Sequence, residues 1–466
     1  MKRIAYFSPL NPIRSGISDY SEDLLPLLGD AYHIDIYIPN AFIVENKTIA
    51  ERFDIKFYSE FVLNYKDKRY DSILYHMGNN YEAHHGIYDF MLQYPGIVIL
   101  HDYSLHHFFA AKTLVLGDQE GYREEMFYSH GEQGLQAADK FIKGKIPPIW
   151  ENDSLNYPMN LRVLDRSAGV IVHSEFAKNL LRKQASYVPI RVVPIPAPHI
   201  SEYEQVQIEK QRARSELNID PSEFVICSLG FANPTKRIDK ILEALAKIQV
   251  DKLMNGFKFY IVGEISENYP VQEIVIRHKL SKVVRCIGFV DLDYFGKYIA
   301  ASDICLNLRY PTQGESSASL LKIMGYGKPV IATRIGSFSE FPDHIVHKAG
   351  YELDEVSSII NLLVEIYSKP NDERTKELLE FTQRYHSLNA CADGYIDFID
   401  KVMKGEQINI NLGIQETFDD FVENISSILM PTQLRDVSVR YIDECLHIFG
   451  RKEMEMCESS RTTLYT

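Results

Sequence analysis

Short apolar runs rich in β-branched residues alternate with longer amphipathic segments along most of the chain, which limits the fold to a few α/β architectures. Runs of this length suit parallel strands buried on both faces, and the segments between them are long enough for helical crossovers. The runs of the first half are Ile4–Phe7, His33–Ile38, Ser72–Tyr75, Ile97–Leu100, Val170–Val172 and Arg191–Ile195. Those of the second half are Phe224–Leu229, Phe257–Val262, Val283–Ile287, Asp303–Leu308 and Val330–Thr333.

The two series are separated by a proline-rich stretch that resists helix formation and suits a hinge. Its prolines are Pro189, Pro194, Pro196 and Pro198. Two doubly wound, Rossmann-like domains are therefore expected, over residues 1–195 and 196–385, with helices over 386–466 that first pack back on the N-terminal domain. Ligands of such sheets bind beyond the carboxyl ends of the strands, so two facing sheets predict a cleft between the domains.

Bulk composition excludes several classes of protein. The net charge of −14 argues against a basic surface for nucleic acid. The six cysteines show no metal-ligand spacing, and three of them lie in apolar runs, which suits a reducing compartment. The first strand begins almost at residue 1, and no apolar run is long enough to span a bilayer. A cytoplasmic protein is therefore expected.

Two candidate ligand loops follow strands of the first series. Gly16 precedes a helical segment, where the backbone can approach a phosphate at the positive helix end, although an ordinary turn glycine explains the same pattern. The run Ile97–Leu100 ends in His101 and Asp102, at the edge where α/β sheets present chemistry. His101 can bind a sugar hydroxyl or balance phosphate charge, and the alternative is a capping aspartate beside a structural histidine.

Two more loops follow strands of the second series. Gly230, Lys236 and Arg237 stand between a strand end and a helix, which suits a diphosphate, although a solvated Lys-Arg pair gives the same pattern. The last loop is the sharpest signal, because it combines a cation, a carboxylate and a serine-rich helix start that can bind an anion. Its polar residues are Arg309, Glu315, Ser316, Ser317 and Ser319. A serine-capped helix with an acidic first turn is the plainer alternative.

These four loops, together with the Gly327-Lys-Pro-Val-Ile stretch, occur in the order found in glycosyltransferase family 4, and residues 1–400 resemble that family. The Gly78-Asn79-Asn80 turn and the stretches LHDYSLHH and LRYPTQGESSAS are similar to members that build bacterial surface polysaccharides. The resemblance implies the GT-B fold, with an N-terminal acceptor domain and a C-terminal donor domain. It also implies a retaining transfer from a UDP- or GDP-linked sugar to a glycan or lipid-linked acceptor.

The resemblance implies a role for each motif residue. Gly16 would lie under the donor diphosphate, His101 beside the transferred sugar, and Glu315 against that sugar. Lys236 would pair with the diphosphate and stabilise the departing nucleoside diphosphate. The catalytic set is therefore His101, Lys236 and Glu315. The donor-binding set adds Gly16, Gly230, Arg237, Val290, Arg309, Ser316, Ser317 and Ala318. Cations and helix dipoles handle the leaving-group charge in such enzymes, so neither a metal nor a cofactor is expected beyond the nucleotide sugar itself.

The sequence departs from the family pattern at three positions that concern the donor. Lys322 stands where a second glutamate binds the ribose, and the position of the first glutamate falls on Gly314, one residue before Glu315. Phe231 stands where an arginine often follows the glycine. These departures favour an alternative, a catalytically inactive GT-B subunit that stabilises a partner glycosyltransferase. A third class is another GT-B activity. A sugar-nucleotide epimerase would need additional carboxylates around the donor, and a pyridoxal-type phosphorylase would need a Schiff-base lysine; we identify neither in the sequence.

A last segment raises the question of a membrane. Lys140, Lys143 and Lys145 are interleaved with apolar residues up to Trp150. Such a pattern can touch an anionic lipid surface, and a solvated helix end with a buried Trp150 is the alternative. Peripheral membrane contact therefore stays open as a partner of the N-terminal half.

Overall fold

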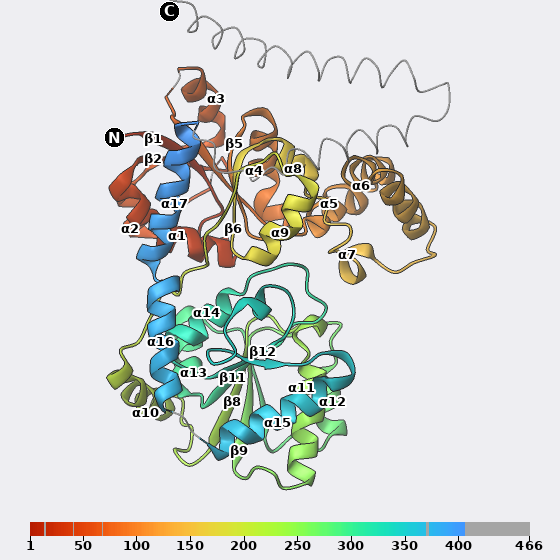
Figure 1. The fold of residues 1–466 in the computed structure, drawn as a ribbon, viewed down its shortest axis with the longest axis vertical. Coiled ribbons are helices and arrows are strands. Elements are labelled where there is room, and N and C mark those ends of the chain that lie inside the picture. The colour runs from red at the N-terminus through yellow and green to blue at the C-terminus, as the bar shows by residue number, and fades with distance from the viewer. Residues whose placement is uncertain (14, 41, 68, 370–371, 406–466) are drawn as a thin grey trace, which may run out of the picture. The chain divides into compact units, whose positions relative to one another are not determined.

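The structure is a computed structural model that describes residues 1–13, 15–40, 42–67, 69–369 and 372–405. Within this range the chain forms two parallel sheets with helices on both faces of each (Figure 1). The helical extension expected over residues 406–466 lies outside the described residues.

The first sheet has seven strands in the order β3-β2-β1-β4-β5-β6-β7, all parallel. The strands are β1 Arg3–Phe7, β2 His33–Ile38, β3 Asp54–Phe57, β4 Ser72–Met77, β5 Gly96–Leu100, β6 Ser167–Val172 and β7 Ile190–Val192. Their connections are α1 Gly16–Ala31, α2 Lys47–Arg52, α3 Tyr58–Lys66, α4 Tyr81–Gln93, α5 His106–Thr113, α6 Gln119–Ile142, α7 Ile149–Asn152, α8 Leu161–Asp165 and α9 Glu175–Gln184.

The second sheet has six strands in the order β10-β9-β8-β11-β12-β13, again parallel. The strands are β8 Phe224–Leu229, β9 Phe257–Val262, β10 Val284–Gly288, β11 Ile304–Asn307, β12 Val330–Thr333 and β13 His347–Ala349. The helices are α10 Val206–Glu216, α11 Ile238–Val250, α12 Val271–Arg277, α13 Leu292–Ala301, α14 Ala318–Gly325 and α15 Glu355–Ser368, followed by α16 Asp372–His386 and α17 Leu388–Met403.

The predicted doubly wound architecture is confirmed, and each predicted apolar run forms a strand. Two strands, β3 and β13, escaped prediction, because both are short edge strands without a continuous apolar run. The run expected to reach Ile195 ends as a strand at Val192, since Pro194 has no N–H for a ladder hydrogen bond.

The chain crosses between the sheets twice, and the two crossings are bonded to each other. The first crossing is the linker after β7, and the second is the junction of α16 and α17. Ala197 N donates to the carbonyl of His386 at 2.7 Å, and His386 Nδ1 donates to the carbonyl of Ile195 at 2.9 Å. Helix α17 then packs on α1 and β6 of the first sheet, where the Tyr20 and Tyr395 hydroxyls lie 2.7 Å apart.

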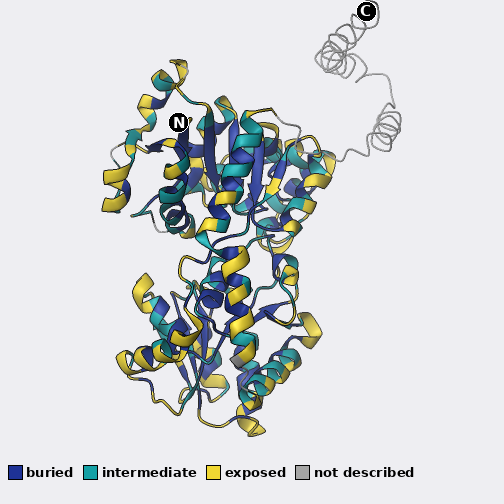
Figure 2. Cartoon of the chain, turned by 60° about the vertical axis from the view of Figure 1, so that its left-hand side comes forward, coloured by how far each residue is buried: buried dark blue, intermediate teal, exposed yellow. Residues whose placement is uncertain are grey.

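The buried apolar residues form a core that continues through the crossing. One cluster contains Leu24 of α1, Ile195 of the linker, Leu321 of α14 and Phe398 of α17. The strands are almost entirely buried, and exposed residues gather on the outer faces of the helices (Figure 2). Among the described residues, no helix combines the length and apolarity that crossing a bilayer would require.

Gly325, at the end of α14, gives a direct test of the packing between this helix and the linker. A Cβ on Gly325 would lie 2.0 Å from the carbonyl oxygen of His199, and Ser201 N donates to the Gly325 carbonyl at 2.7 Å. We expect Gly325→Ala to destabilise the protein by about 1–3 kcal/mol, as overpacking does. The control is Gly16→Ala, because a Cβ there meets nothing within 4 Å. Differential scanning fluorimetry should show a lower midpoint for Gly325→Ala only; equal midpoints would refute this view of the linker.

Candidate functional site

The site expected at the carboxyl ends of β8 and β11 is centred on a buried lysine. Gly230 follows β8 with φ +93, a conformation that favours glycine. The chain then turns through Pro234–Lys236, and this turn returns the Lys236 side chain to the strand ends. Lys236 is 5% exposed, and its Nζ donates to the Leu229 carbonyl at 3.1 Å and to Asn307 Oδ1 at 3.4 Å.

The charge of Lys236 is not balanced by a carboxylate. Within the described part of the chain, no Asp or Glu oxygen is recorded in an ion pair with its Nζ. Burial, together with the positive charge of Arg309, lowers the pKa of Lys236 to about 7, and the negative charge of Glu315 opposes that shift. A buried amine with only neutral oxygen partners is a ready site for an anion, since the anion would stabilise its protonated form.

Asn307 joins this lysine to the start of α14. Its Nδ2 donates to Ser317 Oγ at 3.0 Å, and Ser319 Oγ donates to its Oδ1 at 3.2 Å. Ser317 is the N-cap of α14 and accepts from Leu320 N at 3.2 Å. The structure therefore brings together Lys236, Ser317 and Ala318, three of the predicted donor-binding residues, at a helix N-terminus.

The loop that precedes α14 is held by its own charged residues. Arg309 Nη1 donates to Thr235 Oγ1 at 2.9 Å, and its Nε lies 2.8 Å from Glu315 Oε1. The other carboxylate oxygen of Glu315 accepts from Gln313 N at 2.6 Å and from Thr312 Oγ1 at 3.1 Å. Glu315 thus stabilises the loop in this structure, and its contact with a sugar stays a prediction.

Arg237 is held by an ion pair in this structure. Its guanidinium pairs with Glu355, with Nη2 2.6 Å from Oε2, and its expected contact with the donor stays a prediction. The ion pair forms because Glu355 is fully buried and needs a counter-ion. Arg309, rather than Arg237, is therefore the second cation near Lys236.

His101 lies inside a row of histidines, and its expected place beside the transferred sugar stays a prediction. His76 from β4, His101 after β5 and His173 after β6 are hydrogen bonded in sequence, with nitrogen separations of 2.9 Å and 3.1 Å. The ring of Tyr20 packs edge-on against His101 at 5.0 Å. Both ring nitrogens of His101 are therefore already used by protein partners, and neither is available to a sugar in this arrangement.

The hydrogen bond of His173 with the Val193 carbonyl, at one end of the row, sets the tautomer of each neutral ring. His173 Nδ1 lies 2.8 Å from the Val193 carbonyl, which can only accept, so this nitrogen carries the hydrogen. His173 Nε2 then accepts from His101 Nδ1, and His101 Nε2 accepts from His76 Nδ1. The row ends at His76 Nε2, a buried acceptor without a partner in the described structure. This direction of the row belongs to neutral rings, the form that burial favours by lowering the pKa of all three histidines.

Asp102, next to His101, lies toward the loop of the other domain. Its Oδ2 accepts from Asn79 N at 2.8 Å. Burial raises the pKa of Asp102 to about 6, and the negative charge of Glu315 raises it further. The hydrogen bond from Asn79 and the positive charge of Arg309 lower this pKa. These influences across the cleft show that Asp102, Arg309 and Glu315 belong to one electrostatic environment.

The remaining predicted positions lie around this centre. Gly16 is the first residue of α1, after the N-cap Ser15, and the space beside its Cα is open. Val290 follows the end of β10 and is half-buried, and Phe231 is exposed. Lys322 Nζ lies 3.9 Å from Asp19 of α1, so it faces a carboxylate rather than supplying one for a ribose.

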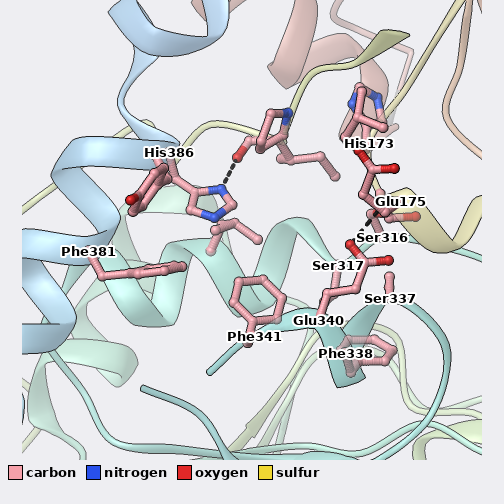
Figure 3. A pocket seen from close by; sticks show the side chains of 16 residues that line it. His173, Glu175, Ser316, Ser317, Ser337, Phe338, Glu340, Phe341, Phe381 and His386 are labelled. Atoms are coloured by element: carbon pink, nitrogen blue, oxygen red, sulfur yellow. Dashed lines mark hydrogen bonds between the residues drawn. The ribbon is translucent and has the colours of Figure 1, made fainter. Parts of the chain in front are cut away.

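A cavity of about 240 Å³ lies between the domains beside the start of α14 (Figure 3). Ser316 and Ser317 line it together with His173, the last member of the histidine row. Glu340 also lines it and accepts from Glu175 N at 3.0 Å and from Phe176 N at 2.5 Å, which ties the second domain to the start of α9. Asn307 and His173 lie at the carboxyl ends of β11 and β6, a position that points to a site in the sequence. Glu340 ends the short 3₁₀ helix Gly336–Glu340 and has no such signal.

In the lysine-rich segment from Lys140 to Trp150, the apolar side chains pack toward the protein. Phe141, Ile142 and Ile146 pack against the core of the first domain, and the rings of Phe141 and Trp150 lie 5.0 Å apart. Lys143 pairs with Asp139 at 3.4 Å. The three lysines are exposed and these apolar residues are half-buried, and contact of this segment with a membrane stays a prediction.

Residues 209–377 match the family model described as glycosyl transferases group 1, which covers most of the second domain. A search of curated protein sequences finds no match.

Solved structures resemble nearly the whole described chain. Sucrose-phosphate synthase from Thermosynechococcus elongatus is 17% identical with a TM-score of 0.57, over 87% of this chain and 100% of that one. HepE from Anabaena, in complex with UDP and glucose, is 13% identical with a TM-score of 0.57, over 86% and 100%. WaaG, a glycosyltransferase involved in lipopolysaccharide biosynthesis, is 14% identical with a TM-score of 0.52, over 85% and 99%.

The fold is therefore GT-B, as predicted. The family match, on this shared fold, supports a glycosyltransferase enzyme.

The histidine row predicts a loss of stability in acid. Burial lowers the pKa of His173 to about 4 and those of His76 and His101 well below the usual value, so the unfolded chain binds protons that the folded chain does not. Stability should be full above pH ~6.5 and fall by about 1.4 kcal/mol per histidine for each pH unit below that value, until the folded pKa is reached.

Urea denaturation at pH 8 and pH 5 checks this expectation. His101→Asn should lose less stability between the two pH values than the wild type, whereas His33→Asn, at an exposed histidine, should behave like the wild type. An unchanged pH dependence in His101→Asn would show that the row does not stay neutral in the folded protein.

Proposed function

We propose that the protein is a retaining glycosyltransferase of family 4 that moves a sugar from a UDP- or GDP-linked donor to a glycan or lipid-linked acceptor, in polysaccharide biosynthesis. The observation that carries the proposal is Lys236, a buried amine beside a helix N-terminus with no carboxylate partner recorded for it in the described chain. UDP is the first donor nucleotide to test, since the similar HepE structure holds UDP.

The chemistry follows from where charge develops. When the bond between the sugar and the diphosphate breaks, negative charge builds on the leaving phosphate oxygen. Lys236, Arg309 and the free N–H groups at the start of α14 can stabilise that charge without moving. Retention needs no protein nucleophile in the front-face mechanism of this family. A product with inverted configuration would instead point to Asp102 as a general base.

The proposal includes no resident metal. The Asp291-Leu-Asp293 motif has the spacing of a metal-binding Asp-x-Asp, but both carboxylates bind protein groups. Asp291 caps α13 by accepting from Tyr294 N at 2.9 Å, and Asp293 pairs with Lys297 at 2.8 Å. Asp291 is thus the N-cap of α13.

A second candidate, an inactive GT-B subunit, is favoured by one observation. Lys322 occupies the position of the ribose glutamate and is paired with Asp19. The subunit would bind no donor, so donor hydrolysis by the purified protein separates it from the enzyme. Cytoplasmic location, with peripheral contact at the inner face of a membrane, stays a prediction for either candidate.

Replacing Lys236 tests the proposed enzyme directly. Lys236→Met keeps the apolar stem and removes the charge, so we expect donor turnover to fall on the order of 10²–10³, as for other groups that stabilise a developing anion. The control is Lys247→Met, an exposed lysine on α11. Release of UDP from UDP-sugars by both variants measures the effect. Near-normal turnover in a folded Lys236→Met protein would contradict the role of this lysine.

Metal removal gives an independent prediction. Because cations of the chain handle the leaving-group charge, turnover should be the same with EDTA as with added Mg²⁺ or Mn²⁺. The measurement is donor turnover after dialysis against EDTA. Loss of turnover that Mn²⁺ restores would overturn the metal-independent mechanism.

A further inference from the structure

Helix α6, which the proposed chemistry does not use, is kinked at Gly131. Gly131 has φ 58 and ψ −148, outside the helical region, so the helix changes direction there. A Cβ on Gly134 would lie 2.3 Å from the carbonyl oxygen of Met126, which shows how closely the two halves approach. The kink directs the second half of α6 along the α7 turn.

A cavity of about 370 Å³ lies between this second half of α6 and the α7 turn, a volume in the range of small-molecule sites of ~300–1,000 Å³. Gln133, Gln136 and Lys140 follow one another along one face of α6, and Asn152 and Asp153 face them from the end of α7. The five polar side chains therefore converge on one space from two elements.

The polar groups are free to bind a ligand. No hydrogen bond is recorded for the side chains of Gln133, Gln136 or Lys140 with any residue that the structure describes. Asn152 donates one N–H to the Pro148 carbonyl at 2.9 Å, and Asp153 accepts from Asn156 through one oxygen at 2.7 Å. Both keep a second polar atom. Amides offer a donor and an acceptor side by side, which matches hydroxyl groups that donate and accept at once.

The rest of the cavity is apolar. Ala137 is 8% exposed and Ile149 is 2% exposed, and Ile146, Pro147 and the ring of Tyr157 complete the lining. The Tyr157 ring is fixed by an edge-on contact with His130 at 5.3 Å, and its carbonyl accepts from His106 Nδ1 at 2.6 Å. A sugar ring combines hydroxyls at its edge with an apolar C–H face, and this lining offers both kinds of contact.

The cavity also stands next to the donor loop. Gln313 Nε2 donates to the carbonyl of Trp150, in the α7 turn, at 3.3 Å. In the same loop, a Cβ on Gly314 would touch the Tyr103 side chain at 2.6 Å. The α7 turn therefore connects the cavity to the loop that carries Arg309 and Glu315.

We propose that this cavity binds a saccharide unit of the acceptor and holds it for transfer. The inference rests on the proposed function, because it assigns a substrate class to that reaction. Gln133 and Gln136 bind ring hydroxyls, Asn152 and Asp153 complete the hydrogen bonding, and the apolar lining receives the C–H face. Lys140 and Asp153 bring one charge of each sign, so neutral sugars and sugars with a single carboxylate both fit.

The test compares Gln133→Ala/Gln136→Ala with Gln119→Ala, which removes an exposed glutamine from the first half of the same helix. Both exchanged glutamines are exposed, so folding is expected to persist. The probe is an array of immobilised neutral and uronic-acid-containing oligosaccharides. UDP affinity, measured by calorimetry on the same proteins, reports on the donor site separately.

Wild type and Gln119→Ala should bind a subset of the oligosaccharides, and the double variant, which loses two hydrogen-bonding side chains, should bind them at least ~10-fold more weakly with unchanged UDP affinity. Equal binding by the double variant, or no binding by the wild type, would overturn the saccharide site. Failure of the wild type to bind any nucleotide diphosphate would count against the proposed function instead, and the array result would stand on its own.

Discussion

The buried amine of Lys236 is the constraint around which the site is arranged. It is held by a carbonyl and an amide oxygen, with its charge balanced by no recorded carboxylate of the described chain. Burying an uncompensated cation is costly, and its pKa of about 7 expresses that cost. The arrangement becomes favourable once an anion enters, because the anion stabilises the charge that the protein leaves unbalanced. Asn307 connects Lys236 to the start of α14, whose N–H groups also favour a negatively charged group.

The fold was predictable because its strands are buried on both faces and therefore appear as continuous apolar runs. β3 and β13, at the sheet edges, lack such runs. The meeting of Lys236 and Ser317 was also predictable, since β8 and β11 are neighbours and their carboxyl ends share one edge. The ion pair of Arg237 was not predictable, because its partner Glu355 lies 118 residues away and carries no local signal. The hydrogen bonds of His101 were not predictable for a similar reason, since His76 and His173 come from two other strands.

The two domains are linked by contacts on both sides of the site. Glu340 binds the first N–H groups of α9, Lys322 pairs with Asp19, and Gln313 reaches the α7 turn. The linker and the α16–α17 junction are bonded to each other behind these contacts. The histidine row begins beside this linker, at the Val193 carbonyl, and ends in the core of the first sheet. These polar contacts add to the apolar cluster of Leu24, Ile195, Leu321 and Phe398, which continues from one domain to the other.

The most direct measurement of the central claim is the proton uptake that accompanies UDP binding. At pH 8 the Lys236 amine, with a pKa of about 7, is mostly neutral, and a bound diphosphate should raise that pKa. Calorimetry in two buffers of different ionisation enthalpy should then show uptake of a large fraction of one proton by the wild type and none by Lys236→Met. Binding without proton uptake, or the same uptake in both proteins, would contradict the claim that this lysine meets the diphosphate.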